Sequence, residues 1–251
     1  MKPFNKVTCA ILLPILTAPP LSGCTAVRQH PALIAVLPIA AAAGVAISPF
    51  YIADRIIAPT PARPLNQQPM YGNQPKTQPM IDADQRFIED ALKTGLTRAQ
   101  ASDKSVQLGW QYFQQRHDIA TAMKRFNQAW LLDPDNGDAF HGFAILMMER
   151  DHAPIQADAL FRQGIAKPRQ SPGIWLDYGR FLVMVKKPAE AVAPLRQALT
   201  FPDMGPDAEA LLTLALAQSG DRVAACAEKP KVEDGAQKAP REAARVIPCD
   251  P

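Results

Sequence analysis

The residues of this 251-residue chain that could do thiol or metal chemistry are four cysteines and four histidines. The histidines, at positions 30, 117, 141 and 152, lack the spacing of a metal site such as HExxH. We therefore expect them to be exposed to solvent. The sequence also lacks a G-x-S-x-G elbow, a phosphate-binding glycine loop and paired catalytic carboxylates. These features predict no enzyme, and no catalytic residues, metal, cofactor or small-molecule substrate.

Cys24 lies in a sequence context that indicates covalent lipid attachment. Two lysines precede an apolar run over residues 7–16, and the tetrad LSGC then ends at Cys24, in the order of a secretory signal. The tetrad resembles the lipobox of bacterial lipoproteins, which implies removal of residues 1–23 and a lipid anchor on the sulfur of Cys24. Thr25 is not the aspartate that retains such lipoproteins at the inner membrane, so the resemblance favours the outer membrane, facing the periplasm. The alternative is an ordinary cleaved signal without lipid.

Export, as this resemblance implies, leaves two cysteines free to pair. Cys9 is removed with the signal and Cys24 is lipidated, so Cys226 and Cys249 are the remaining thiols in an oxidising compartment. We expect a disulfide between them, which would stabilise the fold by about 3 kcal/mol in the chain-entropy model. The alternative is two unpaired cysteines.

The composition of the chain predicts two further segments before the folded part. Residues 24–58 hold the lipidated N-terminus and an alanine-rich apolar segment, uncharged over residues 31–53. This segment is expected to lie at the membrane interface, to dock on the chain's own groove or on a partner, or to span the bilayer. Residues 59–80 are rich in proline and glutamine, which predicts a disordered linker.

Helical periodicity begins after this linker. Residues 81–227 show it throughout, with Asp82 and Thr97 as N-caps of the first two helices and Gly95 as the stop between them. Residues 228–251 are charged and carry prolines, so we expect an irregular tail held at Cys249.

Large and small residues recur in three copies over residues 81–227. The first copy has Leu108, Gly109, Tyr112, Ala122, Phe126, Ala129 and Pro134, the second has Phe140, Phe143, Ala144, Met147, Ala157, Phe161 and Gly164, and the third has Trp175, Tyr178, Gly179, Leu182, Ala191, Leu195, Ala198 and Pro202. This pattern resembles the tetratricopeptide repeat (TPR), a helical hairpin of about 34 residues. The first two copies carry one extra residue in the turn. The predicted fold class is all-α: a short TPR-type solenoid of about three repeats, plus a capping helix over residues 208–218.

The TPR resemblance also implies a partner-binding groove lined by the first helix of each repeat. Family positions five, nine and twelve fall here on Val106, Trp110 and Phe113, on His141, Ile145 and Met148, and on Leu176, Arg180 and Val183. Because these residues are mostly apolar, we expect another polypeptide segment to cover them. We expect either an apolar or amphipathic helix or peptide of a partner, anchored on Trp110 and Phe113 with Arg180 as the polar contact, or the chain's own residues 31–58 or 82–93.

The charge of the chain excludes one class of partner. Its 27 basic and 24 acidic residues, with a net charge of +3, are spread along the sequence without the basic patch of a nucleic-acid binder. The resemblance implies a membrane-anchored TPR lipoprotein that serves as a protein–protein interaction scaffold or adaptor in the bacterial cell envelope. The alternatives are an assembly factor, similar in layout to pilotins or to outer-membrane-assembly lipoproteins, and a permanent accessory subunit of an envelope complex.

Overall fold

The computed structural model describes residues 63–229 and 238–249. The signal at residues 1–23, Cys24 and the apolar segment at residues 31–53 lie outside these ranges, so what was expected of them stays a prediction. No helix within the described ranges is both long enough and apolar enough to cross a bilayer.

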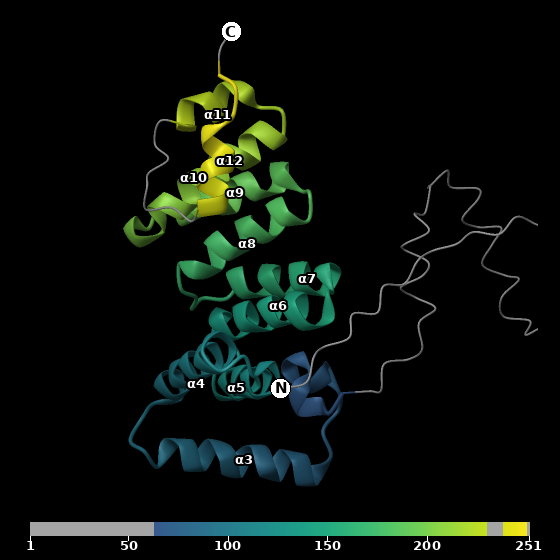
Figure 1. Cartoon of the computed structure of the whole chain (residues 1–251). Coiled ribbons are helices and arrows are strands. Elements are labelled where there is room, and N and C mark those ends of the chain that lie inside the picture. Colours follow the sequence, from purple (N-terminus) through teal and green to yellow (C-terminus); the bar gives the residue numbers. More distant parts are fainter. Residues whose placement is uncertain (1–62, 230–237, 250–251) are drawn as a thin grey trace, which may run out of the picture. The chain divides into compact units, whose positions relative to one another are not determined.

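The helices pair into consecutive antiparallel hairpins (Figure 1). The pairs are α4 (Arg98–Gln114) with α5 (Ile119–Leu132), α6 (Gly137–Asp151) with α7 (Pro154–Ile165), α8 (Gly173–Met184) with α9 (Pro188–Ala198), and α10 (Gly205–Gln218) with α11 (Arg222–Glu228). Each hairpin packs on the next, because α5 contacts α6, α7 contacts α8 and α9 contacts α10. The predicted all-α hairpin solenoid is confirmed, and its capping helix is α10, which pairs with the short α11.

All four hairpin turns use one residue in the left-handed conformation. These residues are His117, His152, Lys186 and Gly220. The residue that follows each of them donates its backbone N–H to a carbonyl of the first helix, in the pairs Asp118 to Tyr112, Ala153 to Met147, Lys187 to Leu182 and Asp221 to Leu216. The acceptor lies six residues before the donor in the first two hairpins and five residues before it in the last two. The longer reach accounts for the extra residue in the first two turns.

The ring of Phe126 shows why small residues recur in the pattern. It is fully buried between α4 and α6. A Cβ atom on Gly109 of α4 would lie 2.6 Å from this ring, and one on Gly142 of α6 would lie 2.3 Å from it. In the third hairpin, a Cβ on Gly179 would lie 2.4 Å from Leu195. The helices therefore approach so closely that the facing position holds no side chain.

The expected disordered linker at residues 59–80 is corrected from residue 63 onward. Residues 63–76, which we call the strap, form two short 3-10 helices, η2 (Leu65–Gln67) and η3 (Pro69–Asn73), that pack against α5. The side chain of Asn127 bonds to the strap backbone, donating to the carbonyls of Asn66 and Gln68 and accepting from the N–H of Tyr71. Polar contacts to main-chain groups order the strap, whereas the prediction had considered only apolar burial.

The first long helix, α3 (Gln78–Leu92), begins earlier than the Asp82 cap predicts. Proline in its first turn suits this earlier start, because the missing N–H has no partner there in any helix. Thr97 caps α4 as expected, in a reciprocal capping box with Gln100. Helix α3 packs against α4 and α5 at the first hairpin.

The C-terminal tail is also more ordered than predicted. Residues 238–245 form α12 (Lys238–Arg245), which packs on α10, and Ala244 and Ile247 bury a small apolar cluster with Ala210. The expected disulfide joins Cys226 to Cys249, with 5.5 Å between their Cα atoms. The tail folds back because this bond and the α10 contact hold its end beside α11.

Replacing Gly142 with alanine is predicted to lower the free energy of unfolding by about 1 to 3 kcal/mol, because the added methyl group must displace the ring of Phe126. Gly205 is the matched control, since its helical backbone has open space around the missing Cβ. Denaturant unfolding of Gly142→Ala and Gly205→Ala checks this. Equal stability of the two variants would show that the close helix approach is not what Gly142 provides.

Candidate protein-binding site

The residues predicted to line a groove lie together on the first helices of three consecutive hairpins. We call this set the first-helix stripe: Val106, Trp110 and Phe113 on α4, His141, Ile145 and Met148 on α6, and Leu176, Arg180 and Val183 on α8. Its members differ in exposure. Val106, His141, Leu176 and Val183 are buried, whereas Trp110, Phe113, Ile145, Met148 and Arg180 are half-exposed. A partner can therefore reach five of the nine.

One of the two internal segments expected to cover the stripe does not cover its part on α6 and α8. Residues 82–93 belong mostly to α3, which packs on the first hairpin and has no comparable contact with α6 or α8. The other segment, residues 31–58, lies outside the described residues.

Polar and aromatic contacts between neighbouring first helices link residues of the stripe to one another. The rings of Trp110 and His141 lie 4.9 Å apart, and Nε2 of His141 lies 3.0 Å from a carboxylate oxygen of Asp177. Asp177 also pairs with Arg180, whose guanidinium reaches Asp207 of α10 at 3.4 Å. Trp110 and Arg180, two of the half-exposed residues, are therefore held by a series of contacts that continues from α4 to α10.

His141 corrects the expectation that the histidines are exposed. Its side chain is buried, between Trp110 and Phe161 and against Asp177. Burial acts to raise the pKa of Asp177, but the hydrogen bond and charge of His141 and the charge of Arg180 outweigh it, so the pKa lies below its ordinary value. The carboxylate is therefore charged at neutral pH and holds the other two side chains in place.

A pocket lies near each end of α4. Close to its C-terminal end is one of about 390 Å³, lined by Phe113, Gln114, His117, Ile119 and Glu149. Near its N-terminal end is one of about 410 Å³, lined by Asp103, Asn136, Asp138, Pro168, Arg169, Gln170 and Ser171. Arg169 forms ion pairs there with Asp103 and Asp133. Phe113 of the stripe thus borders a pocket with apolar walls, whereas the polar pocket touches α4 at Asp103.

Sequence reasoning missed Asp177 and the Arg169 pocket. The sequence could have indicated Asp177. His141 is a polar residue in a mostly apolar stripe, and a carboxylate on the first helix of the following hairpin is a suitable partner for it. Arg169 lies between hairpins, where no periodicity marks it.

Within residues 63–229 and 238–249, no group of three or more His, Cys, Asp or Glu side chains is arranged to hold a metal ion.

In the first and third hairpins a small residue of the first helix lies against a large residue of the second, Gly109 against Phe126 and Gly179 against Leu195. Phe126, Phe161 and Leu195 occupy equivalent places and are all fully buried. The chain therefore has the TPR-type fold of stacked helical hairpins. Tyr112 and Trp175, which were expected in the same core, are only half-buried at its edge.

Part of this chain is similar in sequence to a protein of known role. The type IV pilus assembly protein PilF of Pseudomonas aeruginosa is 30% identical over 110 residues, 44% of this chain and 43% of PilF. The match thus spans less than half the length of that relative. No protein-family model matches the chain.

Two solved structures are similar to the chain. One is that of PilF from Pseudomonas aeruginosa, with 26% identity and a TM-score of 0.48, covering 54% of this chain and 61% of that chain. The other is YrrB, a TPR protein with an unusual peptide-binding site, with 16% identity and a TM-score of 0.47, covering 58% of this chain and 72% of that chain.

Asp177→Asn is predicted to lower the free energy of unfolding at pH 7 by about 1 to 3 kcal/mol, because it removes the charge that holds His141 and Arg180. A carboxyl whose pKa is lowered by folding stabilises in full above its unfolded pKa of about 3.9 and loses this contribution as the pH falls through its folded pKa. The difference from the unmodified chain should therefore shrink below about pH 4.

Denaturant unfolding at neutral and acidic pH measures this difference. Asp90→Asn is the control, since Asp90 is an exposed carboxylate paired with Lys93, and its change should stay within about 0.5 kcal/mol. An Asp177→Asn effect that is as large in acid as at neutral pH would contradict the assignment.

Proposed function

We propose that this TPR protein is a lipid-anchored interaction scaffold of the bacterial cell envelope, whose first-helix stripe binds an apolar or amphipathic segment of another protein. The observation that carries the proposal is the exposure pattern of the stripe. Trp110, Phe113, Ile145 and Met148 present apolar surface on two neighbouring helices, and Arg180 adds a positive charge on the third. Aromatic and arginine side chains of this kind supply most of the energy at protein interfaces.

The geometry supports binding of an extended or helical segment rather than a small molecule. The half-exposed residues are spread over α4, α6 and α8, and the two pockets beside α4 lie near opposite ends of that helix. The pocket at Phe113 can take an apolar anchor, and the pocket at Arg169 can take polar groups. The contacts of Trp110 with His141 and of Arg180 with Asp177 hold these side chains in place before binding, which reduces the entropy lost on association.

The envelope location rests on the N-terminal sequence. The lipobox resemblance at Cys24 supports cleavage after Gly23, acylation of the cysteine and anchoring at the outer membrane facing the periplasm. The Cys226–Cys249 disulfide is of the kind that persists in an oxidising compartment.

A role as an assembly factor for type IV pili is the second candidate. The sequence similarity to PilF, a type IV pilus assembly protein, favours it. The two candidates differ in their partners, because an assembly factor binds components of one machine and a scaffold binds several unrelated envelope proteins.

Cys24→Ser is predicted to abolish lipid attachment, because the sulfur of Cys24 is the site of the anchor in this proposal. Incorporation of labelled palmitate measures the effect. Cys9→Ser is the control, since Cys9 is removed with the signal. Continued labelling of the Cys24→Ser protein would rule out anchoring at this residue.

Replacing Phe113 and Met148 together with alanine is predicted to weaken partner capture by at least about tenfold, because truncating an anchor residue at an interface core costs about 2 kcal/mol or more. Capture is measured by photocrosslinking from position 145 in intact envelopes, followed by identification of the crosslinked proteins. Ile155→Ala is the control, since Ile155 is an exposed apolar residue on α7, outside the stripe.

The identity of the crosslinked proteins separates the two candidate functions. A single pilus component favours the assembly factor, and several unrelated envelope proteins favour the scaffold. Equal capture by the double variant and the unmodified protein, with thermal unfolding showing both folded, would contradict the assignment of the stripe.

A further inference from the structure

The strap occupies a site on α5 that is separate from the first-helix stripe. We propose that Asn127 and Trp130 of α5, together with Arg150 of α6, form a second peptide-binding site, which takes a compact polypeptide turn bearing an aromatic and a basic side chain. The strap is the ligand of this site within the same chain, and an equivalent segment supplied from outside can replace it. This site does not depend on the proposed function of the stripe.

Asn127 recognises the backbone of the strap rather than its side chains. The asparagine is fully buried, and its Nδ2 donates to the carbonyls of Asn66 at 3.1 Å and Gln68 at 2.8 Å. Its Oδ1 accepts the N–H of Tyr71 at 3.2 Å. Arg150 adds a bond of 2.9 Å to the carbonyl of Gln67. Two side chains thereby form hydrogen bonds with four main-chain groups of the strap. Only a backbone of this conformation can form all four bonds.

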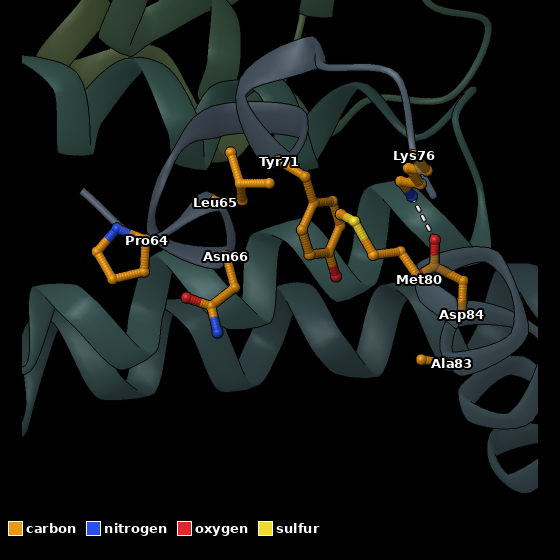
Figure 2. Close-up of a pocket in the computed structure, with 8 residues that line it drawn as sticks. All are labelled: Pro64, Leu65, Asn66, Tyr71, Lys76, Met80, Ala83 and Asp84. Atoms are coloured by element: carbon orange, nitrogen blue, oxygen red, sulfur yellow. Dashed lines mark hydrogen bonds and ion pairs between the residues drawn. The ribbon is translucent and has the colours of Figure 1, made fainter. Parts of the chain in front are cut away.

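Two strap side chains add the chemical preference of the site. The ring of Tyr71 lies 6.4 Å from that of Trp130, and the ammonium of Lys76 lies 4.7 Å from the Tyr71 centroid and 5.8 Å from the Trp130 centroid. Lys76 also pairs with Asp84 of α3, as Figure 2 shows. Burial, and then the charge of Asp84, raise the pKa of Tyr71 to about 12, so its ring binds as a neutral phenol. Aromatic and cationic groups are therefore the favoured partners of Trp130.

The strap is held in a backbone conformation that its residues disfavour. Met70, Tyr71 and Asn73 all have left-handed φ angles, of 51°, 54° and 51°, around Gly72 at 70°. No residue of η2 or η3 is fully buried, and a pocket of about 330 Å³ remains between the strap and α3 (Figure 2). A segment with little apolar burial and a strained backbone opens at a lower free energy than the repeats. This makes the strap exchangeable.

Gly72→Val in the full chain tests release of the strap without changing α5. The added side chain would meet Gln68 Oε1, 2.8 Å from the Cβ position, and a β-branched residue strongly disfavours a φ of +70°. Hydrogen exchange at the Tyr71 amide, which bonds to Asn127, should become faster by roughly tenfold or more. Amides of α4 to α9 should keep their protection.

Exchange is tested with a fluorescent peptide of residues 63–77 added to the full-length protein. Fluorescence anisotropy should show roughly tenfold tighter binding to the Gly72→Val protein than to the unmodified protein, because the competing strap is weakened. A protein with both Gly72→Val and Asn127→Leu should not bind it, and a peptide carrying the Gly72→Val change should bind neither. Protection of the α8 and α9 amides verifies that each variant is folded.

Three results would overturn the proposal. Unchanged exchange at Tyr71 in the Gly72→Val protein would mean that the left-handed turn does not hold the strap. Loss of protection in α4 and α5 together with the strap would make the strap part of the hairpin core rather than a ligand. Failure of the peptide to bind the Gly72→Val protein, with its strap released, would show that Asn127 and Trp130 do not form an independent site.

Discussion

The close contact between the ring of Phe126 and the backbones of α4 and α6 sets the spacing on which the rest of the structure depends. Gly109 and Gly142 face this ring from two different hairpins, and neither position has room for a Cβ atom. One buried side chain therefore fixes both the spacing within the first hairpin and its stacking on the second. Because α4 and α6 are held this near to one another, Trp110 of α4 can meet His141 of α6.

Those inter-helix contacts give the first-helix stripe a firm base. A groove formed by independent helices would present side chains whose positions vary with each hairpin. Here the residues at family position five, Val106, His141 and Leu176, are buried, and the charged pair of Asp177 and Arg180 ties α8 to its neighbours. The half-exposed apolar residues therefore keep a fixed spacing, as specific recognition of a partner requires.

The features that the sequence could predict are those set by local periodicity. Gly109 with Phe126 and Gly179 with Leu195 contact each other across one hairpin, so their residue types recur at a regular spacing and reveal the fold. The strap could not be predicted in this way. Its order comes from Asn127, and an asparagine within a helical pattern does not show whether its amide is solvated or bonded to a distant backbone.

The predictions for the residues at family position five and for the C-terminal tail differed from the structure for similar reasons. A family template assigns a position to a groove but does not show how far the neighbouring first helix covers it, so the burial of His141 was missed. The tail is charged overall, and its order depends on one small apolar cluster at Ala244 and Ile247 together with the disulfide. None of these contacts produces a pattern along the sequence.

Both ends of the hairpin series are closed by segments that do not follow the repeat. At one end Arg63 pairs with Asp151 and the strap crosses to α5, and at the other end α12 folds back on α10 with Cys249 bonded to α11. Duplication or deletion of a hairpin at either end would separate the strap or the C-terminal tail from the helices that it packs against. A change in repeat number is therefore tolerated most readily at the interior hairpin of α8 and α9, which neither closing segment needs.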